Sequence, residues 1–251
     1  MSEILGNDLN LDLDYKKNLL ENHINFLSKH RGMEECIKYG KFIHSDNPDF
    51  NIFFQFSNEG IEKLNKKYAI YLPQWISINE QIKLKYKKCG SLTYMILGNK
   101  EPKWKINKKI VIKRANCLSD IEDFSVAQAW GFCETKEKFN QAYPWMRQKN
   151  IENIDDNTQN FYIAYDDGKP VGVTLCIYYK NIAGIYAVTT LQEYRKQGIS
   201  TTLIQRAVDD AINNNIESIT LQTYIESYSH SFYKKLGFQD VFDCNIFKAI
   251  D

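Results

Sequence analysis

The chain has 251 residues, of which 43% are hydrophobic and 14% aromatic, enough to bury the core of one large domain or two ordinary ones. Its 32 basic and 31 acidic residues give a net charge of +1, and no extended basic block occurs, which argues against a nucleic-acid partner. No apolar run approaches the ~20 residues that span a bilayer, and no charged-then-apolar leader begins the sequence. The composition therefore predicts a soluble, cytoplasmic globular protein without a membrane partner.

The cysteines and histidines point away from a disulfide scaffold and from a metalloprotein. Six cysteines are spread over the whole chain without a Cys-x-x-Cys pair, which is typical of reduced thiols. Four histidines form no His-x-x-x-His or His-Glu-x-x-His arrangement. We therefore expect a reducing compartment and no metal site.

The first part of the chain, residues 1–105, predicts an α+β domain whose role its sequence does not indicate. Tyr15–His30 has apolar residues near helical spacing, and Met33–Tyr39 predicts a second, short helix. The aromatic run Phe50–Phe56 and the run Ser91–Leu97 predict buried strands. No glycine-rich loop or histidine cluster suggests a binding site here.

The second part, residues 110–251, predicts strands and helices in the order β-α-α-β-β-β-α-β-α-β. Ser119-x-x-Glu122 is typical of a capping box at the start of a helix, and Thr135 marks the start of the next helix. Asp166-Asp167-Gly168-Lys169-Pro170 predicts a tight hairpin turn between two strands. Turn residues and apolar periodicity are consistent along this whole part, in contrast to the first.

Ile185–Leu203 combines a strand, a basic turn with a glycine, and the start of a helix. Strand-forming residues run to Thr190, Arg195 supplies positive charge in the turn, and Gly198 precedes the helix. Backbone N–H groups at a helix N-terminus lack intrahelical partners, and the helix dipole favours an anion there. The segment therefore predicts a phosphate-binding site, with a plain strand-to-helix connection as the alternative.

Three motifs and a hairpin turn in this part resemble those of the GNAT superfamily (GCN5-related) of N-acetyltransferases. Ala187–Arg195 (AVTTLQEYR) looks like the family's fourth strand, which runs into its pyrophosphate loop. Arg195–Ser200 (RKQGIS) resembles the family's pyrophosphate loop, (R/Q)-x-x-G-x-(G/A), with a serine in place of the last Gly or Ala. Ser231–Phe238 (SFYKKLGF) is similar to the family's x-x-Y-x-K-x-G-F signature. Asp167–Gly172 (DGKPVG) is similar to its hairpin turn. The resemblance covers residues 110–251.

The resemblance implies the GNAT acyl-CoA N-acyltransferase fold, an α+β (α/β three-layer) architecture. In this fold, helices flank a mixed, mostly antiparallel sheet. Residues 110–251 would form the acetyltransferase domain, and residues 1–105 an additional N-terminal α+β domain. A degenerate GNAT-like copy is one interpretation of that domain, although no motif supports it. Homodimers are common in the superfamily, so the resemblance leaves monomer and homodimer open.

The resemblance also implies an acyl-CoA-dependent N-acetyltransferase. An acetyl group would pass from acetyl-CoA to a primary amine, on a small molecule or a peptide, by direct attack in a ternary complex without a metal. Loop N–H groups would hold the CoA pyrophosphate, and the preceding strand would hold the pantetheine arm. The implied cofactor-binding residues are Val188, Thr189, Thr190, Arg195, Lys196, Gln197, Gly198, Ile199, Ser200, Thr201 and Tyr233.

The implied general acid is Tyr233, because a phenol with a pKa of ~10 is protonated at neutral pH and can donate to a departing thiolate. The base is open: the strand before the loop has no acid, Glu226 is a weak candidate, and Glu193 is another. The aromatic residues between Ala129 and Trp145 are candidates either for an acceptor pocket or for the packed face of two helices. The missing acid and Ser200 motivate the alternative of a non-catalytic acyl-CoA-binding or interaction module.

Overall fold

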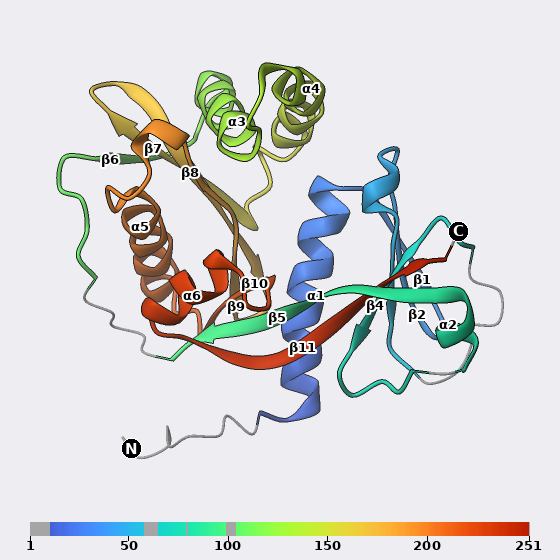
Figure 1. Ribbon diagram of the computed structural model, residues 1–251. Helices are drawn as coiled ribbons and strands as arrows, with labels where there is room; N and C mark the ends of the chain where they lie inside the picture. Colours follow the sequence, from blue (N-terminus) through green and yellow to red (C-terminus); the bar gives the residue numbers. More distant parts are fainter. Residues whose placement is uncertain (1–10, 58–64, 79, 99–103, 251) are drawn as a thin grey trace, which may run out of the picture. The chain divides into compact units, whose positions relative to one another are not determined.

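The computed structural model describes residues 11–57, 65–78, 80–98 and 104–250, apart from the side chains of residues 81 and 82 (Figure 1). These residues form two compact units, each described here by itself. The first unit comprises the described residues up to Gly98 and those from Gln222 onward, and the second comprises the described residues between them. The division into domains at residues 105–110 stays a prediction, while the C-terminal segment groups with the N-terminal part.

The first unit contains a sheet in the strand order β1-β2-β3-β4-β11-β5. All its neighbouring strands are antiparallel except β3 and β4, which are parallel. Its elements are α1 (Leu13–His30), β1 (Met33–Ile37), β2 (Gly40–His44), the 3-10 turn η1 (Pro48–Phe50), β3 (Ile52–Gln55), β4 (Ala69–Pro73), α2 (Glu80–Lys85), β5 (Tyr86–Leu97), α6 (Tyr228–Lys235) and β11 (Phe238–Ala249).

The second unit contains the strand order β10-β9-β8-β7-β6, in which only β9 and β10 are parallel. Strand β10 begins in this unit and ends in the first. The elements are β6 (Val111–Arg114), α3 (Leu118–Phe132), α4 (Lys136–Glu152), β7 (Gln159–Asp166), β8 (Lys169–Tyr179), β9 (Ile182–Thr190), the 3-10 turn η2 (Gln192–Tyr194), α5 (Ile199–Asn213) and β10 (Ser218–Tyr224). From β6 to β11, the described elements confirm the order predicted from the sequence.

The two units repeat one pattern of strand pairing. In the first, β1, β2 and β3 are antiparallel neighbours, and β4 is parallel to β3. In the second, β7, β8 and β9 are antiparallel neighbours, and β10 is parallel to β9. A helix precedes each series, α1 in one case and α4 in the other. The predicted α+β architecture, with helices flanking a mixed sheet, is confirmed.

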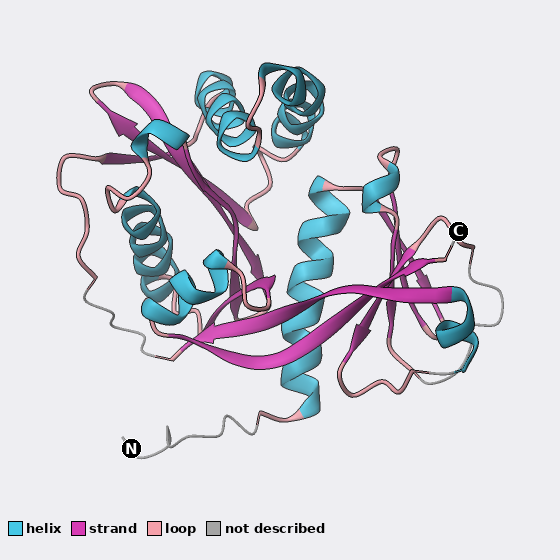
Figure 2. Ribbon diagram, in the orientation of Figure 1, coloured by secondary structure: helices cyan, strands magenta, loops and turns pink. Residues whose placement is uncertain are grey.

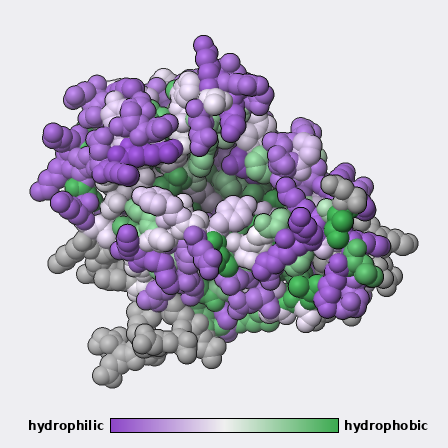
Figure 3. Space-filling model, in the orientation of Figure 1, coloured by the Kyte–Doolittle hydropathy of each residue, from purple (hydrophilic) through white to green (hydrophobic). Residues whose placement is uncertain are grey.

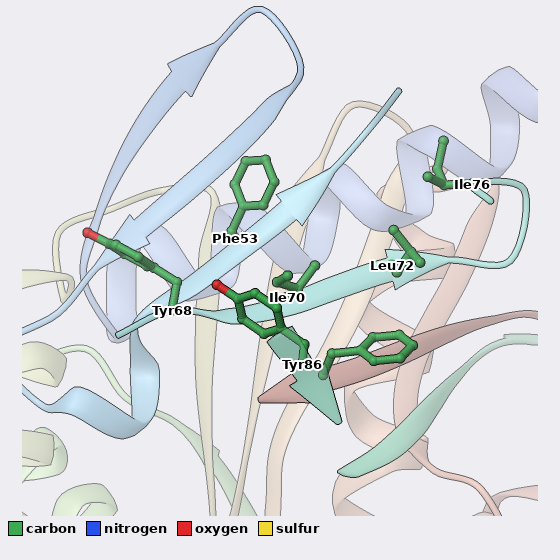
Figure 4. Close-up of a cluster of buried hydrophobic side chains, with 7 residues drawn as sticks. Phe53, Tyr68, Ile70, Leu72, Ile76 and Tyr86 are labelled. Carbon is green, nitrogen blue, oxygen red and sulfur yellow. The ribbon is translucent and has the colours of Figure 1, made fainter. Parts of the chain in front are cut away.

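The last strand of the sequence completes the N-terminal sheet. Strand β11 pairs with β4 on one side and with β5 on the other. One face of this sheet is built from large apolar side chains, including Phe53, Ile70 and Leu72, which Figure 4 shows gathered against Tyr86. Burying such side chains contributes ~1.5–3 kcal/mol each, so strands far apart in sequence share one core.

The segment after α1 corrects a sequence-based prediction. Met33–Tyr39 was expected to be helical, and this is wrong because Met33–Ile37 is strand β1, paired residue by residue with β2. An added Cβ at Gly40, where β2 begins, would overlap the Phe54 carbonyl oxygen, so glycine permits the close approach of β3. Pairing along the strands therefore outweighs the helical preference of the local sequence.

The helix pair α3–α4, seen side by side in Figure 2, has one predicted cap and one that is absent. The Thr135 hydroxyl accepts a hydrogen bond from the N–H of Lys138, as expected for the cap of α4. The predicted capping box at Ser119 is wrong: Cys117 is the N-cap of α3, with no side-chain cap bond. Glu122 instead forms an ion pair with Arg147 on α4, so its carboxylate is engaged between the two helices and does not cap α3.

The face seen in Figure 3 is mostly hydrophilic, with apolar side chains in smaller groups. No helix among the described residues has both the length and the apolar character needed to cross a bilayer.

Candidate functional site

The loop predicted to bind phosphate ends in an unusual backbone conformation. Gly198 is the N-cap of α5 and has φ 79° and ψ 8°, a left-handed conformation that favours glycine. Lys196 is also left-handed, with φ 64°. The first intrahelical bond, from the N–H of Thr202 to the Gly198 carbonyl, is 3.0 Å long. The N–H groups from Gly198 to Thr201 therefore lack intrahelical acceptors and are available to an anion.

A segment outside the predicted motif braces this loop. The Asn107 amide donates to the Gln197 carbonyl at 2.9 Å, and the backbone N–H of Asn107 donates to the Thr202 hydroxyl at 2.9 Å. A Cβ added at Gly198 would meet its nearest atoms, on Asn107 and Lys105, only at 3.8 Å. The glycine is thus required by its φ and not by crowding. Asn107 was missed because an isolated asparagine after a lysine-rich turn carries no recognisable signal.

The side chains of Arg195 and Ser200 tie the loop to the strand before it. The Arg195 guanidinium donates to the carbonyls of Thr190, at 3.2 Å, and Gly131, at 3.1 Å. The Ser200 hydroxyl lies 2.9 Å from that of Thr190. Arginine was predicted to neutralise phosphate, but two of its donors hold the protein backbone, which leaves the others for a ligand. The family pattern has Gly or Ala where this chain has Ser200. Neither of those residues has a side chain that could form this hydrogen bond with Thr190.

Strand β9 carries a bulge just before the loop. Ala187 has φ 50°, and the pairing with β8 shifts between Val173, opposite Thr189, and Leu175, opposite Tyr186. Thr174 on β8 therefore faces two residues of β9, and its hydroxyl donates to the Tyr186 carbonyl at 3.1 Å. A bulge leaves an extra residue out of the ladder, here Ala187 or Val188. Neither bulge position is a glycine or a proline, so the bulge could not be predicted from the sequence.

The end of α3 packs closely against β9. A Cβ added at Gly131 would overlap the Thr189 side chain, so this glycine allows the helix to approach the strand. Its carbonyl is also the acceptor for Arg195. Thr189 and Thr190 are both buried, 7% and 6% exposed, so their side chains are packing elements and only their backbone remains for a ligand.

The aromatic residues of α3 and α4 form a stack. The rings of Trp130 and Phe139 are 4.3 Å apart and nearly parallel, and those of Phe139 and Tyr143 are 5.1 Å apart. The Tyr143 hydroxyl donates to Glu122 at 3.0 Å, and hydrogen bonds from Arg147 hold the pKa of this carboxyl below its usual range. Of the two readings offered by the sequence, these contacts support the packed face of two helices.

Tyr233, the predicted acid, lies on α6 in the first unit. Its ring packs against Phe232, at 5.3 Å between centroids, and edge-on to Phe238, at 5.8 Å. Burial raises the pKa of the phenol, so it stays protonated at neutral pH. Among the described residues, none forms a hydrogen bond with its hydroxyl, which is consistent with a group that can donate elsewhere.

The two candidate bases are both exposed. Glu226 follows β10 and has φ 60°, a strained conformation for a residue with a side chain. Its carboxylate has no ion-pair partner in the described part of the chain, whereas Glu193, on η2, lies 3.6 Å from the Lys169 ammonium. Strain concentrates at functional positions, which favours Glu226 over Glu193. No cluster of three or more His, Cys, Asp or Glu side chains suited to a metal ion occurs in the described ranges.

Comparison with known proteins gives a consistent result. The sequence model of the acetyltransferase (GNAT) family matches residues 125–238. An uncharacterized N-acetyltransferase of Chlorobaculum tepidum is 22% identical over 97 residues, which are 38% of this chain and 60% of that protein. The chain spans about 39–60% of the length of the curated relatives it matches.

Two solved structures share the fold at low sequence identity. A GCN5-related N-acetyltransferase from Kribbella flavida has a TM-score of 0.63 at 7% identity, covering 93% of this chain and 96% of that chain. A tandem GNAT protein from the clavulanic acid biosynthesis pathway has a TM-score of 0.58 at 9% identity, covering 83% of this chain and 78% of that chain. The tandem neighbour is consistent with the repeated strand pairing of the two units. Residues 125–238 thus match the acetyltransferase (GNAT) family model, and two solved GNAT structures share the fold.

Proposed function

We propose that the chain is an N-acetyltransferase that transfers an acetyl group from acetyl-CoA to a primary amine, of a small molecule or a peptide, by direct attack in a ternary complex. The observation that carries the proposal is the N-terminus of α5, where a left-handed Gly198 precedes N–H groups without intrahelical acceptors. The family assignment supports acyl-CoA as the anion that this loop binds.

The loop and the strand proposed to bind the donor lie in the second unit, whereas Tyr233 lies in the first. In the proposal, N–H groups from Gly198 to Thr201 hold the CoA pyrophosphate, with Lys196 and the free donors of Arg195 neutralising its charge. The backbone of Val188 to Thr190 pairs with the amides of the pantetheine arm as an added strand would. The bulge at Ala187 fits this role, because it takes backbone groups of β9 out of pairing with β8.

The chemistry needs positioning more than a strong base. Deprotonating an alkylamine of pKa ~10.4 at neutral pH costs ~4 kcal/mol, whereas orienting two bound reactants lowers the barrier by ~7–11 kcal/mol. The amine nitrogen attacks the thioester carbon, its proton leaves through Glu226 or water, and the CoA thiolate departs with a proton from Tyr233. A backbone N–H of β9 that polarises the thioester carbonyl, at Val188 or its neighbour, contributes ~3–4 kcal/mol.

The six cysteines are all free thiols, which supports the proposed cytoplasmic location.

A monomer or a homodimer is compatible with the proposal, because none of its steps uses a second chain.

The test is a screen of the full chain with acetyl-CoA and a panel of small amines and peptides, read out as thiol release and as the mass of the acetylated product. Turnover on at least one amine, with Tyr233→Phe impaired, is expected. Tight CoA binding without turnover on any amine, and with Tyr233→Phe indistinguishable from the wild type, supports the alternative, a non-catalytic acyl-CoA-binding module.

A further inference from the structure

We propose that His230 and Asp240 are positioning residues that lock the Glu226 turn and helix α6 onto strand β11. This inference rests on the proposed function, because it assigns a role to the element that carries both Glu226 and Tyr233. The hydrogen bonds that hold the Glu226 turn can be tested by hydrogen exchange, without any enzyme activity.

The contacts form one chain of hydrogen bonds. The backbone N–H of Glu226 donates to Nδ1 of His230 at 3.2 Å, and Nε2 of His230 lies 2.9 Å from Oδ1 of Asp240. The second carboxylate oxygen of Asp240 accepts from Nζ of Lys234, one helical turn further along α6, at 2.7 Å. The Asp240 carboxylate therefore contacts α6 at His230 and at Lys234, one before and one after Tyr233 in the sequence.

The two bonds of His230 fix its tautomer. Nδ1 accepts a hydrogen bond, so the ring proton resides on Nε2 and points at the carboxylate. The imidazole is largely shielded, with 16% of its side chain exposed. Partial burial disfavours ionisation of Asp240, but the hydrogen bonds from Lys234 and His230 outweigh it and hold the pKa of the carboxyl below its usual range. The acceptor for His230 is therefore a carboxylate across the neutral pH range.

The lock acts at the strained point of the turn. Glu226 has φ 60°, a strained conformation that persists only when neighbouring contacts hold it. The contact from His230 is made by the Glu226 N–H itself, and the same helix turn is capped by Ser227, whose hydroxyl accepts from the N–H of His230 at 3.0 Å. One imidazole thereby couples the direction of the Glu226 side chain to the start of the helix that carries Tyr233.

Three substitutions at His230 in the full chain separate its hydrogen bond to Glu226 from its hydrogen bond to Asp240. His230→Ala removes both bonds. His230→Asn keeps an acceptor near the Nδ1 position, and His230→Gln keeps a donor near the Nε2 position. Asp240→Asn weakens the lock from the strand side, and Asp243→Asn, on the same strand, is its matched control because the Asp243 carboxylate bonds to nothing on α6 among the described contacts.

The first readout is hydrogen exchange of the Glu226 amide. It is expected to be roughly tenfold faster in His230→Ala and His230→Gln, and near the wild-type rate in His230→Asn and Asp243→Asn. The second readout is steady-state kinetics on the best amine. A ~10- to 100-fold loss of kcat is expected in His230→Ala, with an unchanged KM for acetyl-CoA and partial recovery in His230→Asn.

Unchanged exchange at Glu226 in His230→Ala overturns the lock, whatever the activity. Faster exchange with unaltered kcat overturns the positioning role in an active enzyme. If the wild type acetylates no amine, the proposed function fails, and the exchange rates alone decide whether the lock exists.

Discussion

The two strand series of the molecule have the same pairing but different connections. The β1-β2-β3 series is followed by a parallel strand, β4, as the β7-β8-β9 series is followed by β10. Between β9 and β10 the chain carries Arg-x-x-Gly and helix α5, whereas the sequence between β3 and β4, Phe56–Tyr68, is shorter and contains no arginine. The pairing framework therefore does not require the loop that is proposed to bind phosphate.

The third strands also differ in register. Strand β3 pairs with β2 without interruption, from Ile43 opposite Ile52 to Gly40 opposite Gln55. Strand β9 has a register shift and a left-handed Ala187 at the place where the pantetheine arm is proposed to bind. Among the described residues, the register shift proposed for donor binding occurs in the β7-β8-β9 series and not in the β1-β2-β3 series.

Substitution of Tyr233 tests whether the C-terminal signature contributes to the reaction. Tyr233→Phe removes the proposed proton donor and is expected to lower kcat by ~10²–10⁴, while CoA affinity and melting temperature stay close to the wild type. The melting temperature is expected to hold because no described residue bonds to the Tyr233 hydroxyl. Thiol-release kinetics on the best amine measure the effect, and a variant with unaltered kcat contradicts the role of the phenol.

Two glycine-to-alanine substitutions, one in each strand series, allow the two series to be compared at a similar loss of stability. Gly131→Ala introduces a Cβ that overlaps Thr189 beside the bulged strand, and Gly40→Ala introduces one that overlaps Phe54 in the other series. Each is expected to lower the free energy of unfolding by about 1–3 kcal/mol in urea titrations. Only Gly131→Ala is expected to weaken CoA binding, because it moves α3 away from β9. Equal CoA affinity in both variants would show that this packing is irrelevant to the site.

His23, in the first unit, makes the stability of the protein depend on pH. Burial lowers the pKa of His23 from 6.5 to about 3, and its Nδ1 lies within hydrogen-bond distance of the Tyr94 hydroxyl, at 2.6 Å. Below pH 6.5 the unfolded chain takes up a proton that the folded chain does not, so stability is lost as pH falls from 6.5 towards 3. Between pH 7 and pH 5 the loss from this group is about 2 kcal/mol.

Urea denaturation of the wild type and of His23→Asn at pH 7 and pH 5 measures this loss of stability. The variant lacks the titrating group, so its stability difference between pH 7 and pH 5 is expected to be smaller by that amount. Equal differences in the two proteins contradict the buried neutral imidazole.

Local chemistry made part of the structure predictable. The left-handed Asp167 and Gly168 of the hairpin turn, the Thr135 cap and the left-handed Gly198 each depend on residues within a few positions, and each was predicted as a turn, a cap or a helix start. Met33–Ile37 was mistaken for a helix because its strand conformation depends on pairing with β2.

The missed features of the site all depend on distant partners. Asn107 supports Gln197 across 90 positions of sequence, and Gly131 matters only because α3 approaches Thr189. The place of β11 between β4 and β5 depends on pairing with strands at the other end of the chain. A single sequence carries no local sign of such contacts.

We propose that the chain has one donor site, built by the Gly198 loop. The most direct measurement is isothermal titration of the full chain with CoA, in the wild type, in Gly198→Asp and in Gly168→Asp. The two glycines have the same φ of 79°, but Gly168 lies in the hairpin turn with nothing near an added Cβ. We predict one CoA per wild-type chain, no detectable binding in Gly198→Asp, and wild-type affinity in Gly168→Asp. Retained affinity in Gly198→Asp, or two molecules of CoA per chain, would contradict the account.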